Sequence, residues 1–289
     1  MSGDSFDLDF IQKDRLTVPV SLVKGLNEKQ LLGMKAFTDW CKTLKKSLDQ
    51  QNEENHDFHK SPYTLKAIKI ESVNFFGARI GFLKFEATIS NASKSVLPGV
   101  VFLRGGSVAV LMILRPRDRP NERLVIMTEQ PRIPAGSLAF LEIPAGMLDD
   151  QDDFGGKAAE EIEEETGLKI HKRDLKNMTE MVINSAKNVT DEAQLNNETR
   201  VSTMEKLQDA MYPSPGGSDE YIPIFVWEKT LDRQQIQELK GKLSGDRRQG
   251  EMIRLRLIDY EDFWRIGARD AKALAAWALY ESLKRSGDL

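Results

Sequence analysis

Five glutamates crowd one short stretch of the chain, and their spacing makes it the segment best suited to chemistry. They are Glu160, Glu161, Glu163, Glu164 and Glu165. The stretch is expected to be helical, because an acidic cap region (Asp150, Asp152, Asp153) precedes it and Gly167 follows it. Glu161, Glu164 and Glu165 are three or four residues apart, so they share one helix face.

This arrangement is unfavourable in an isolated helix. Like charges at these spacings repel by roughly 0.2–0.5 kcal/mol per pair, and carboxylates in the last turn meet the negative end of the helix dipole. A divalent cation bound on this face would remove both costs, and carboxylate oxygens suit Mg²⁺ or Mn²⁺. Glu-rich helix ends are also common as solvated faces, so charge alone leaves both interpretations open.

The wider spacing resembles the Nudix box, G-x5-E-x7-R-E-U-x-E-E-x-G-U, in which U is a bulky apolar residue. Gly146 opens the pattern, Asp152 follows after five intervening residues, and Gly167 with Leu168 closes it. Two positions depart from it: Asp152 stands where Glu is usual, and Glu160 stands where Arg is usual. In the family that arginine helps to orient the catalytic carboxylates, so its replacement bears on the rate of any reaction.

Three further segments favour the same substrate class. Arg132, in Glu-Gln-Pro-Arg, offers a planar, permanently charged donor fork for a phosphate. Ala145 and Gly146 end a predicted strand in an irregular turn, where a carbonyl would suit a hard cation and a glycine lets a ligand approach the backbone. The loop 214–220, Ser-Pro-Gly-Gly-Ser-Asp-Glu, resembles the SPG-x-x-x-E loop of the ADP-ribose and ADP-sugar diphosphatase branch of the Nudix family.

The resemblance implies a Mg²⁺- or Mn²⁺-dependent hydrolase that cleaves the diphosphate of an ADP-sugar, such as ADP-ribose or ADP-glucose, to AMP and a sugar 1-phosphate. It implies metal ligands at Ala145, Glu161, Glu164 and Glu165, catalytic carboxylates at Glu164 and Glu220, and a phosphate contact from Arg132. Gly146, which lets a ligand approach the backbone, and Phe75, whose ring could face a nucleobase, are further candidates for substrate contact. Phe75 is also compatible with a core position, which the sequence by itself favours. Two alternatives remain open: a Nudix-fold module that binds a nucleotide sugar without cleaving it, as Glu160 suggests, and a hydrolase of a UDP-sugar or NADH.

Composition narrows the class of protein. The 289 residues suffice for one large or two modest domains, and 41 Lys and Arg against 45 Asp and Glu leave no strong field for nucleic acid or an anionic membrane. No apolar run reaches the ~18–20 residues that cross a bilayer, so a soluble protein is expected. A single cysteine, Cys41, indicates a reducing compartment, and its place on an apolar stripe predicts a buried apolar side chain. A homodimer and a plastid location are expected only because the chain resembles plant chloroplast enzymes of the family. Its first residues are unlike a transit peptide.

The elements expected around these residues give an α+β fold. The pattern predicts a helix and an antiparallel sheet in the first part of the chain. The resemblance implies that residues 1–95 form a smaller domain used for dimerisation and substrate contact, and that 96–289 form a Nudix α/β/α sandwich with a mixed sheet. The segment 187–200 has no apolar period and is predicted to be a surface excursion. The closing helix, 270–285, is expected to bury Leu274, Trp277 and Ala278.

Overall fold

The computed structural model describes residues 4–12, 15–148, 153–192, 207–245 and 252–289. Its contacts divide the chain into two compact units. The first comprises residues 1–106, 195–208 and 214–221, and the second comprises 107–194, 209–213 and 222–289. The division is not a single cut, because the loop 214–221 belongs to the first unit although its neighbours in the sequence belong to the second.

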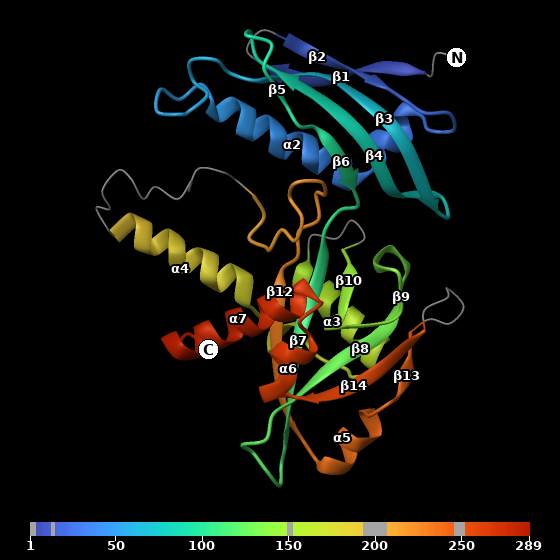
Figure 1. Ribbon diagram of the computed structural model, residues 1–289, viewed down its shortest axis with the longest axis vertical. Helices are drawn as coiled ribbons and strands as arrows, with labels where there is room; N and C mark the ends of the chain where they lie inside the picture. The colour runs from blue at the N-terminus through green and yellow to red at the C-terminus, as the bar shows by residue number, and fades with distance from the viewer. Residues whose placement is uncertain (1–3, 13–14, 149–152, 193–206, 246–251) are drawn as a thin grey trace. The chain divides into compact units, whose positions relative to one another are not determined.

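The first unit is a sheet covered by two helices (Figure 1). Its elements are β1 (Ser5–Gln12), β2 (Arg15–Ser21), α1 (Glu28–Gly33), α2 (Lys35–Gln50), β3 (Thr64–Phe76), β4 (Arg79–Ser90), β5 (Val96–Leu97) and β6 (Val100–Leu103). The strands follow the order β1-β2-β3-β4-β5, and β6 also pairs with β4. The pairing is antiparallel except between β2 and β3, which run parallel. The expected antiparallel sheet is therefore present with one parallel pair.

The core of the first unit lies between α2 and the sheet. Alternate residues of β4 point inward, and the Phe85 ring meets Phe37 edge-on at 6.0 Å and Trp40 at 4.8 Å between centroids. Cys41 lies on the same helix face and is buried, which confirms the interpretation of this residue as a small apolar side chain. Burial raises the pKa of its thiol to about 12, so the reactive thiolate is scarce at neutral pH.

Cys41 is expected to resist alkylation and disulfide exchange in the folded protein at pH 8, and to react fully once the chain is unfolded in urea. The reason is that access and thiolate formation are both suppressed by packing. Titration with a chromogenic disulfide, with and without denaturant, measures this directly. Rapid stoichiometric labelling of the native protein would contradict the buried position.

The second unit is built on a mixed sheet whose strands have the order β11-β12-β7-β8-β14-β13 (Figure 1). The strands are β7 (Ser107–Pro116), β8 (Leu124–Arg132), β9 (Ser137–Glu142), β10 (Ala145–Met147), β11 (Lys176–Asn177), β12 (Ile224–Leu231), β13 (Leu243–Ser244) and β14 (Ile253–Asp259). β7 pairs with β12 in parallel and with β8 antiparallel. It is buried almost throughout, as expected for a central strand covered on both faces.

Helices cover both faces of this sheet, which gives the expected α/β/α sandwich. The helices are α3 (Phe154–Thr166), α4 (Met178–Glu192), α5 (Arg233–Leu239), α6 (Tyr260–Ile266) and α7 (Ala271–Ser286), with short 3-10 turns η1 (Ile133–Ala135) and η2 (Lys172–Asp174). Every second residue of β7, Ala109, Leu111 and Ile113, shares one core with α4, α6 and α7. The fully buried Ala158 and Ile162 of α3 are not part of that core. None of the helices in the described ranges is long and apolar enough to cross a membrane.

Two sequence expectations in this unit were wrong in detail. α4 continues to Glu192, so the first part of the segment 187–200 is helical rather than an irregular excursion, while 193–200 lies outside the described residues. In α7, Leu274 and Ala278 are exposed and Trp277 is half-buried, whereas Ala273, Ala276, Tyr280 and Leu283 form the buried face. The apolar stripe was therefore placed about one residue out of phase, because nearly every position near it is apolar and small.

Candidate functional site

The helix that carries the glutamates is capped as its sequence predicts. The carboxylate of Asp153 accepts a hydrogen bond from the Gly156 amide at 3.0 Å, and Gly167 ends the helix in the left-handed conformation, with φ of 75°. The Gly167 amide donates to the Glu163 carbonyl oxygen at 2.9 Å. Local residues thus set both ends of α3.

The last turn of α3 is stabilised by β13 and the residue before it. Lys242 Nζ donates to the carbonyl oxygen of Thr166 at 3.1 Å, and the hydroxyl of Ser244 donates to the carbonyl oxygen of Glu165. A cation at the negative end of the helix dipole is favourable. Lys242 therefore offsets part of the cost that carboxylates impose on this turn.

Glu165 lies in the interior with one oxygen unsatisfied. The residue is 5% exposed, and its Oε2 has no hydrogen-bond partner among the described residues. Burial, followed by the charges of Glu161 and Glu142, raises the pKa of Glu165 well above its ordinary value of 4.5, against the opposing effects of Arg132 and the Ala145 amide. A buried carboxylate oxygen without a partner costs about 1–3 kcal/mol or more, so the geometry suits a bound cation.

Glu161 is held close to the backbone of β10. A Cβ atom added at Gly146 would lie 1.8–2.2 Å from the atoms of the Glu161 carboxylate, so any larger residue would displace that carboxylate from its present position. On its other side, Glu161 Oε1 accepts from Lys157 Nζ at 2.9 Å, and the two side chains are 14% and 9% exposed. The absence of a side chain at Gly146 therefore lets the Glu161 carboxylate approach the main chain of β10, and the contact of Gly146 with a ligand stays a prediction.

A buried ionic network lies beside these glutamates and was missed in the sequence. Glu142, whose side chain is 4% exposed, accepts from Arg132 Nε at 2.6 Å and from Lys272 Nζ at 2.9 Å. Lys272 Nζ also donates to Asp270 Oδ1 at 2.9 Å, and Asp270 Oδ2 accepts from the Ile143 amide at 3.1 Å. Burial acts to lower the pKa of Lys272, but Asp270 and Glu142 outweigh it and the pKa is raised. No short-range pattern links residues 142 and 272, so only the fold could reveal this network.

The strand topology brings these groups together. β8 pairs with β7 only through Leu124–Ile126, and beyond that point the edge of β7 is taken by β10, with Ala145 opposite Ala109. β9 pairs with β8, and the chain then continues through Ile143 and Pro144 into β10. The site therefore lies where two neighbouring strands diverge, and α3 packs against β10 at this position.

The loop 214–221 is anchored within the first unit. The Phe102 amide donates to the Gly217 carbonyl oxygen at 2.8 Å, and Asp219 accepts from the amides of Arg104 at 2.8 Å and Gly105 at 3.0 Å. Glu220 lies 3.3 Å from Arg104 in an ion pair whose side chains are 18% and 28% exposed. Burial raises the pKa of Asp219, while the two amides act to lower it. Asp219 was not singled out in the sequence, although an acid flanked by Ser and Glu after two glycines is typical of such a loop anchor.

Replacing Asp219 by asparagine is expected to loosen this loop. One oxygen of the side chain becomes an NH₂ group that cannot accept from a backbone amide, so a buried donor is left unpaired at a cost of about 1–3 kcal/mol. Urea unfolding measures the loss, and hydrogen exchange at Arg104 and Gly105 localises it. The exposed Asp7→Asn in the same unit is the matched control, with an expected change within about 0.5 kcal/mol; equal effects of the two substitutions would contradict the anchor.

The remaining predicted site residues lie as follows. Arg132, Ala145, Gly146, Glu161 and Glu165 are brought together in the second unit. Glu164 is exposed, so its role as ligand or base stays a prediction. Glu220 and Phe75 belong to the first unit. Phe75 is 38% exposed, so the core position that its sequence favoured is wrong, and its contact with substrate stays a prediction. Asp152 lies outside the described residues.

The donor set of the second unit fits a hard divalent cation that keeps most of its water. Within the described ranges no group of three or more His, Cys, Asp and Glu side chains converges as a complete cage. Two carboxylates, Glu161 and the unsatisfied Glu165, beside the Ala145 backbone, are instead the partial shell that Mg²⁺ ordinarily takes while sharing itself with substrate phosphates.

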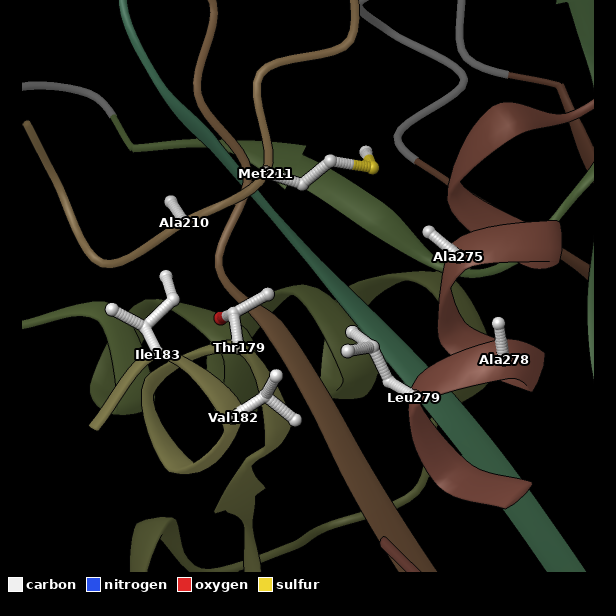
Figure 2. Close-up of a pocket in the computed structure, with 8 residues that line it drawn as sticks. All are labelled: Thr179, Val182, Ile183, Ala210, Met211, Ala275, Ala278 and Leu279. Atoms are coloured by element: carbon white, nitrogen blue, oxygen red, sulfur yellow. The ribbon is translucent and has the colours of Figure 1, made fainter. Parts of the chain in front are cut away.

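An apolar cavity of about 320 Å³ lies in the second unit between α4, α7 and the segment 210–211 (Figure 2). Figure 2 shows Val182, Leu279 and Met211 around it. Its lining residues are Thr179, Val182, Ile183, Ala210, Met211, Ala275, Ala278 and Leu279. None of these described lining residues is charged, so the cavity is unsuited to a diphosphate.

Comparison with known proteins agrees with this geometry. No family model matches the chain. It is 36% identical over 275 residues to Nudix hydrolase 14, chloroplastic, of Arabidopsis thaliana, and the alignment covers 93% of this chain and 78% of that protein. A crystal structure of an ADP compounds hydrolase matches with a TM-score of 0.44 and 14% identity, over 78% of this chain and 99% of the other. With a relative this similar over most of both lengths, and the acidic helix placed against Gly146, the chain belongs to the Nudix hydrolase family.

Proposed function

We propose that the protein hydrolyses the diphosphate of an ADP-sugar, such as ADP-ribose or ADP-glucose, with Mg²⁺ or Mn²⁺, to AMP and a sugar 1-phosphate. The observation that carries the proposal is the Glu161–Glu165 pair, in which a buried oxygen of Glu165 has no partner among the described residues while Glu161 lies against Gly146. The name of the Arabidopsis relative supports a hydrolase.

Each residue has a distinct task in this reaction. Glu161, Glu165 and the Ala145 carbonyl would hold the cation, which when bound neutralises the diphosphate and lowers the pKa of the attacking water. Arg132 is 40% exposed while its Nε is held by Glu142, so its guanidinium is oriented and accessible to a phosphate. Water forms a bond to one phosphorus, the bridging P–O bond breaks, and a carboxylate accepts the water's proton. By resemblance we assign that carboxylate to Glu220, with Glu164 as a further base or ligand and Phe75 in contact with the substrate.

A panel of nucleotide sugars assayed for mononucleotide release tests the proposal. AMP should appear from ADP-ribose or ADP-glucose, should require Mg²⁺ or Mn²⁺, and should stop when EDTA is added. UDP-glucose and NADH in the same panel distinguish the other substrate classes. Binding of ADP-ribose without release of AMP would instead establish the non-hydrolysing module, which the glutamate at position 160 favours.

We further propose a homodimer and a plastid location. The homodimer rests on the resemblance alone, and the plastid location rests on the resemblance and on the name of the chloroplastic relative. Light scattering at several protein concentrations tests the first, and imaging of the tagged full-length protein in plant cells tests the second.

A further inference from the structure

The position where the Nudix box has an arginine is occupied here by Glu160, and its side chain is 56% exposed. Glu160 adds a negative charge next to Glu161 instead of the cation expected there. A site that gathers Glu161, Glu165 and Glu142 would thereby lose the group that orients its carboxylates, unless another cation takes its place.

Lys157 supplies such a cation from one turn earlier on α3. Its Nζ lies 2.9 Å from Glu161 Oε1 and 3.8 Å from Glu160 Oε2. Its side chain is only 9% exposed, in contrast to Lys169, which pairs with Glu163 and is 85% exposed. The ammonium is thus directed at the catalytic face and held there.

Helix stability does not explain this lysine. A lysine four residues before a glutamate is the less favourable order on a helix, and a cation near the N-terminus meets the positive end of the helix dipole. Burying an ammonium has a further desolvation cost unless it is paired. All three costs apply to Lys157, and its ammonium contacts the Glu161 carboxylate. The contact with Glu161 is therefore the reason we consider for its position.

Lys157 and Gly146 hold that carboxylate from two sides. Glu161 lies so close to Gly146 that no Cβ fits between them, and Lys157 bonds to its Oε1. With the rotamer restricted on both sides, Glu161 is pre-oriented beside Glu165. Removal of the ammonium would leave Glu161 repelled by its neighbours and free to rotate away from β10.

We propose that Lys157 is the positioning residue for Glu161, so that its ammonium performs the task that the family pattern gives to an arginine at position 160. The inference rests on the proposed function, since it concerns the same carboxylates. In this chain the cation that contacts Glu161 is therefore at position 157, and position 160 carries an anion.

The experiment compares Lys157→Met with Lys157→Arg and with the double variant Lys157→Met/Glu160→Arg. Calorimetry measures Mg²⁺ binding to each folded protein without substrate, and steady-state assays give kcat and KM for ADP-ribose. Lys157→Met should weaken Mg²⁺ binding and lower kcat by about 10–100-fold, as for other residues that orient metal ligands. Lys157→Arg should remain near wild type, and the added Glu160→Arg should restore most of the loss.

The controls separate positioning from folding and from net charge. Lys169→Met removes the same charge from an exposed pair near the same helix and should leave Mg²⁺ binding and kcat unchanged. Lys157→Gln keeps a hydrogen-bond donor without the charge on a side chain one bond shorter, and replaces Lys157→Met if circular dichroism shows that the latter is unfolded. Unchanged or tighter Mg²⁺ binding with wild-type kcat in the neutral variant would overturn the proposal. Wild-type protein that binds Mg²⁺ in a Lys157-dependent way but releases no AMP would refute the proposed activity alone.

Discussion

Replacing Glu165 by glutamine is expected to abolish metal-dependent hydrolysis while making the metal-free protein more stable. The loss of a ligand should lower kcat by about 10³-fold, equivalent to about 4 kcal/mol of transition-state stabilisation. The gain arises because Glu165 is a buried carboxylate with an oxygen that lacks a partner. Neutralising it removes a desolvation cost of about 1–3 kcal/mol.

The pH dependence of stability has a defined sign for this residue. Its pKa in the folded, metal-free protein lies above the ordinary value of 4.5, so the unfolded chain releases the proton first as pH rises. The stability that the protonated group contributes is complete below about pH 4.5 and is lost as pH rises toward the folded-state pKa. Wild type without metal should therefore lose thermal stability more steeply than Glu165→Gln as the pH rises above about 4.5.

Thermal unfolding with EDTA or Mg²⁺ measures both effects. Mg²⁺ at about 100 times its dissociation constant should stabilise wild type by about 2.7 kcal/mol and Glu165→Gln by much less. Glu163→Gln is the matched control, because Glu163 lies on the same helix but is exposed; its stability and turnover should stay near wild type. Turnover of Glu165→Gln at the wild-type rate would refute the metal site at α3.

The second large effect is expected from Lys272→Met. Lys272 links Glu142 and Asp270, whose side chains are only 4% and 3% exposed. Removing one partner of a buried ionic network while leaving its anions in place costs about 3–5 kcal/mol. The substitution should therefore lower the free energy of unfolding by that amount. It should also raise KM, because Glu142 then holds Arg132 less firmly.

Urea unfolding provides the measurement, and an exposed lysine provides the comparison. Lys172→Met breaks a pair with Asp153 in which the side chains are 62% and 51% exposed, so its effect should be about 0–1 kcal/mol. Similar losses in the two variants would show that burial does not control the strength of these pairs. A stabilising effect of Lys272→Met would mean that apolar packing outweighs the network.

Local sequence signals were sufficient to predict the glutamate-rich helix α3. Asp153, Gly167 and the three- and four-residue spacing of the glutamates determine where α3 begins, ends and faces, and Gly146 marks the point where the backbone must admit a carboxylate. These features depend on neighbours within one or two turns. They can therefore be predicted from the sequence without knowledge of the fold.

Contacts between residues far apart in the sequence could not be predicted in this way. The Glu142–Lys272 contact joins residues 130 apart, and the Asp219 anchor joins residues 115 apart, so no periodicity predicts them. The face of α7 was misplaced because its alanines and apolar residues leave the helical period indistinct. Lys157 was overlooked since a lysine among glutamates resembles an ordinary surface pair until its burial is known.

The interleaved path of the chain limits how the protein can be cut into working pieces. A truncation at Gly106/Ser107 would leave the segment 214–221 attached to the second unit after its hydrogen-bond partners Phe102, Arg104 and Gly105 had been removed. Glu220 would then have no anchor. A fragment that begins at Ser107 would keep the α3 carboxylates but lose the residues that anchor the loop proposed to act with them. Recombination between relatives at that boundary would separate the loop from its matching anchor, so we expect it to be disfavoured.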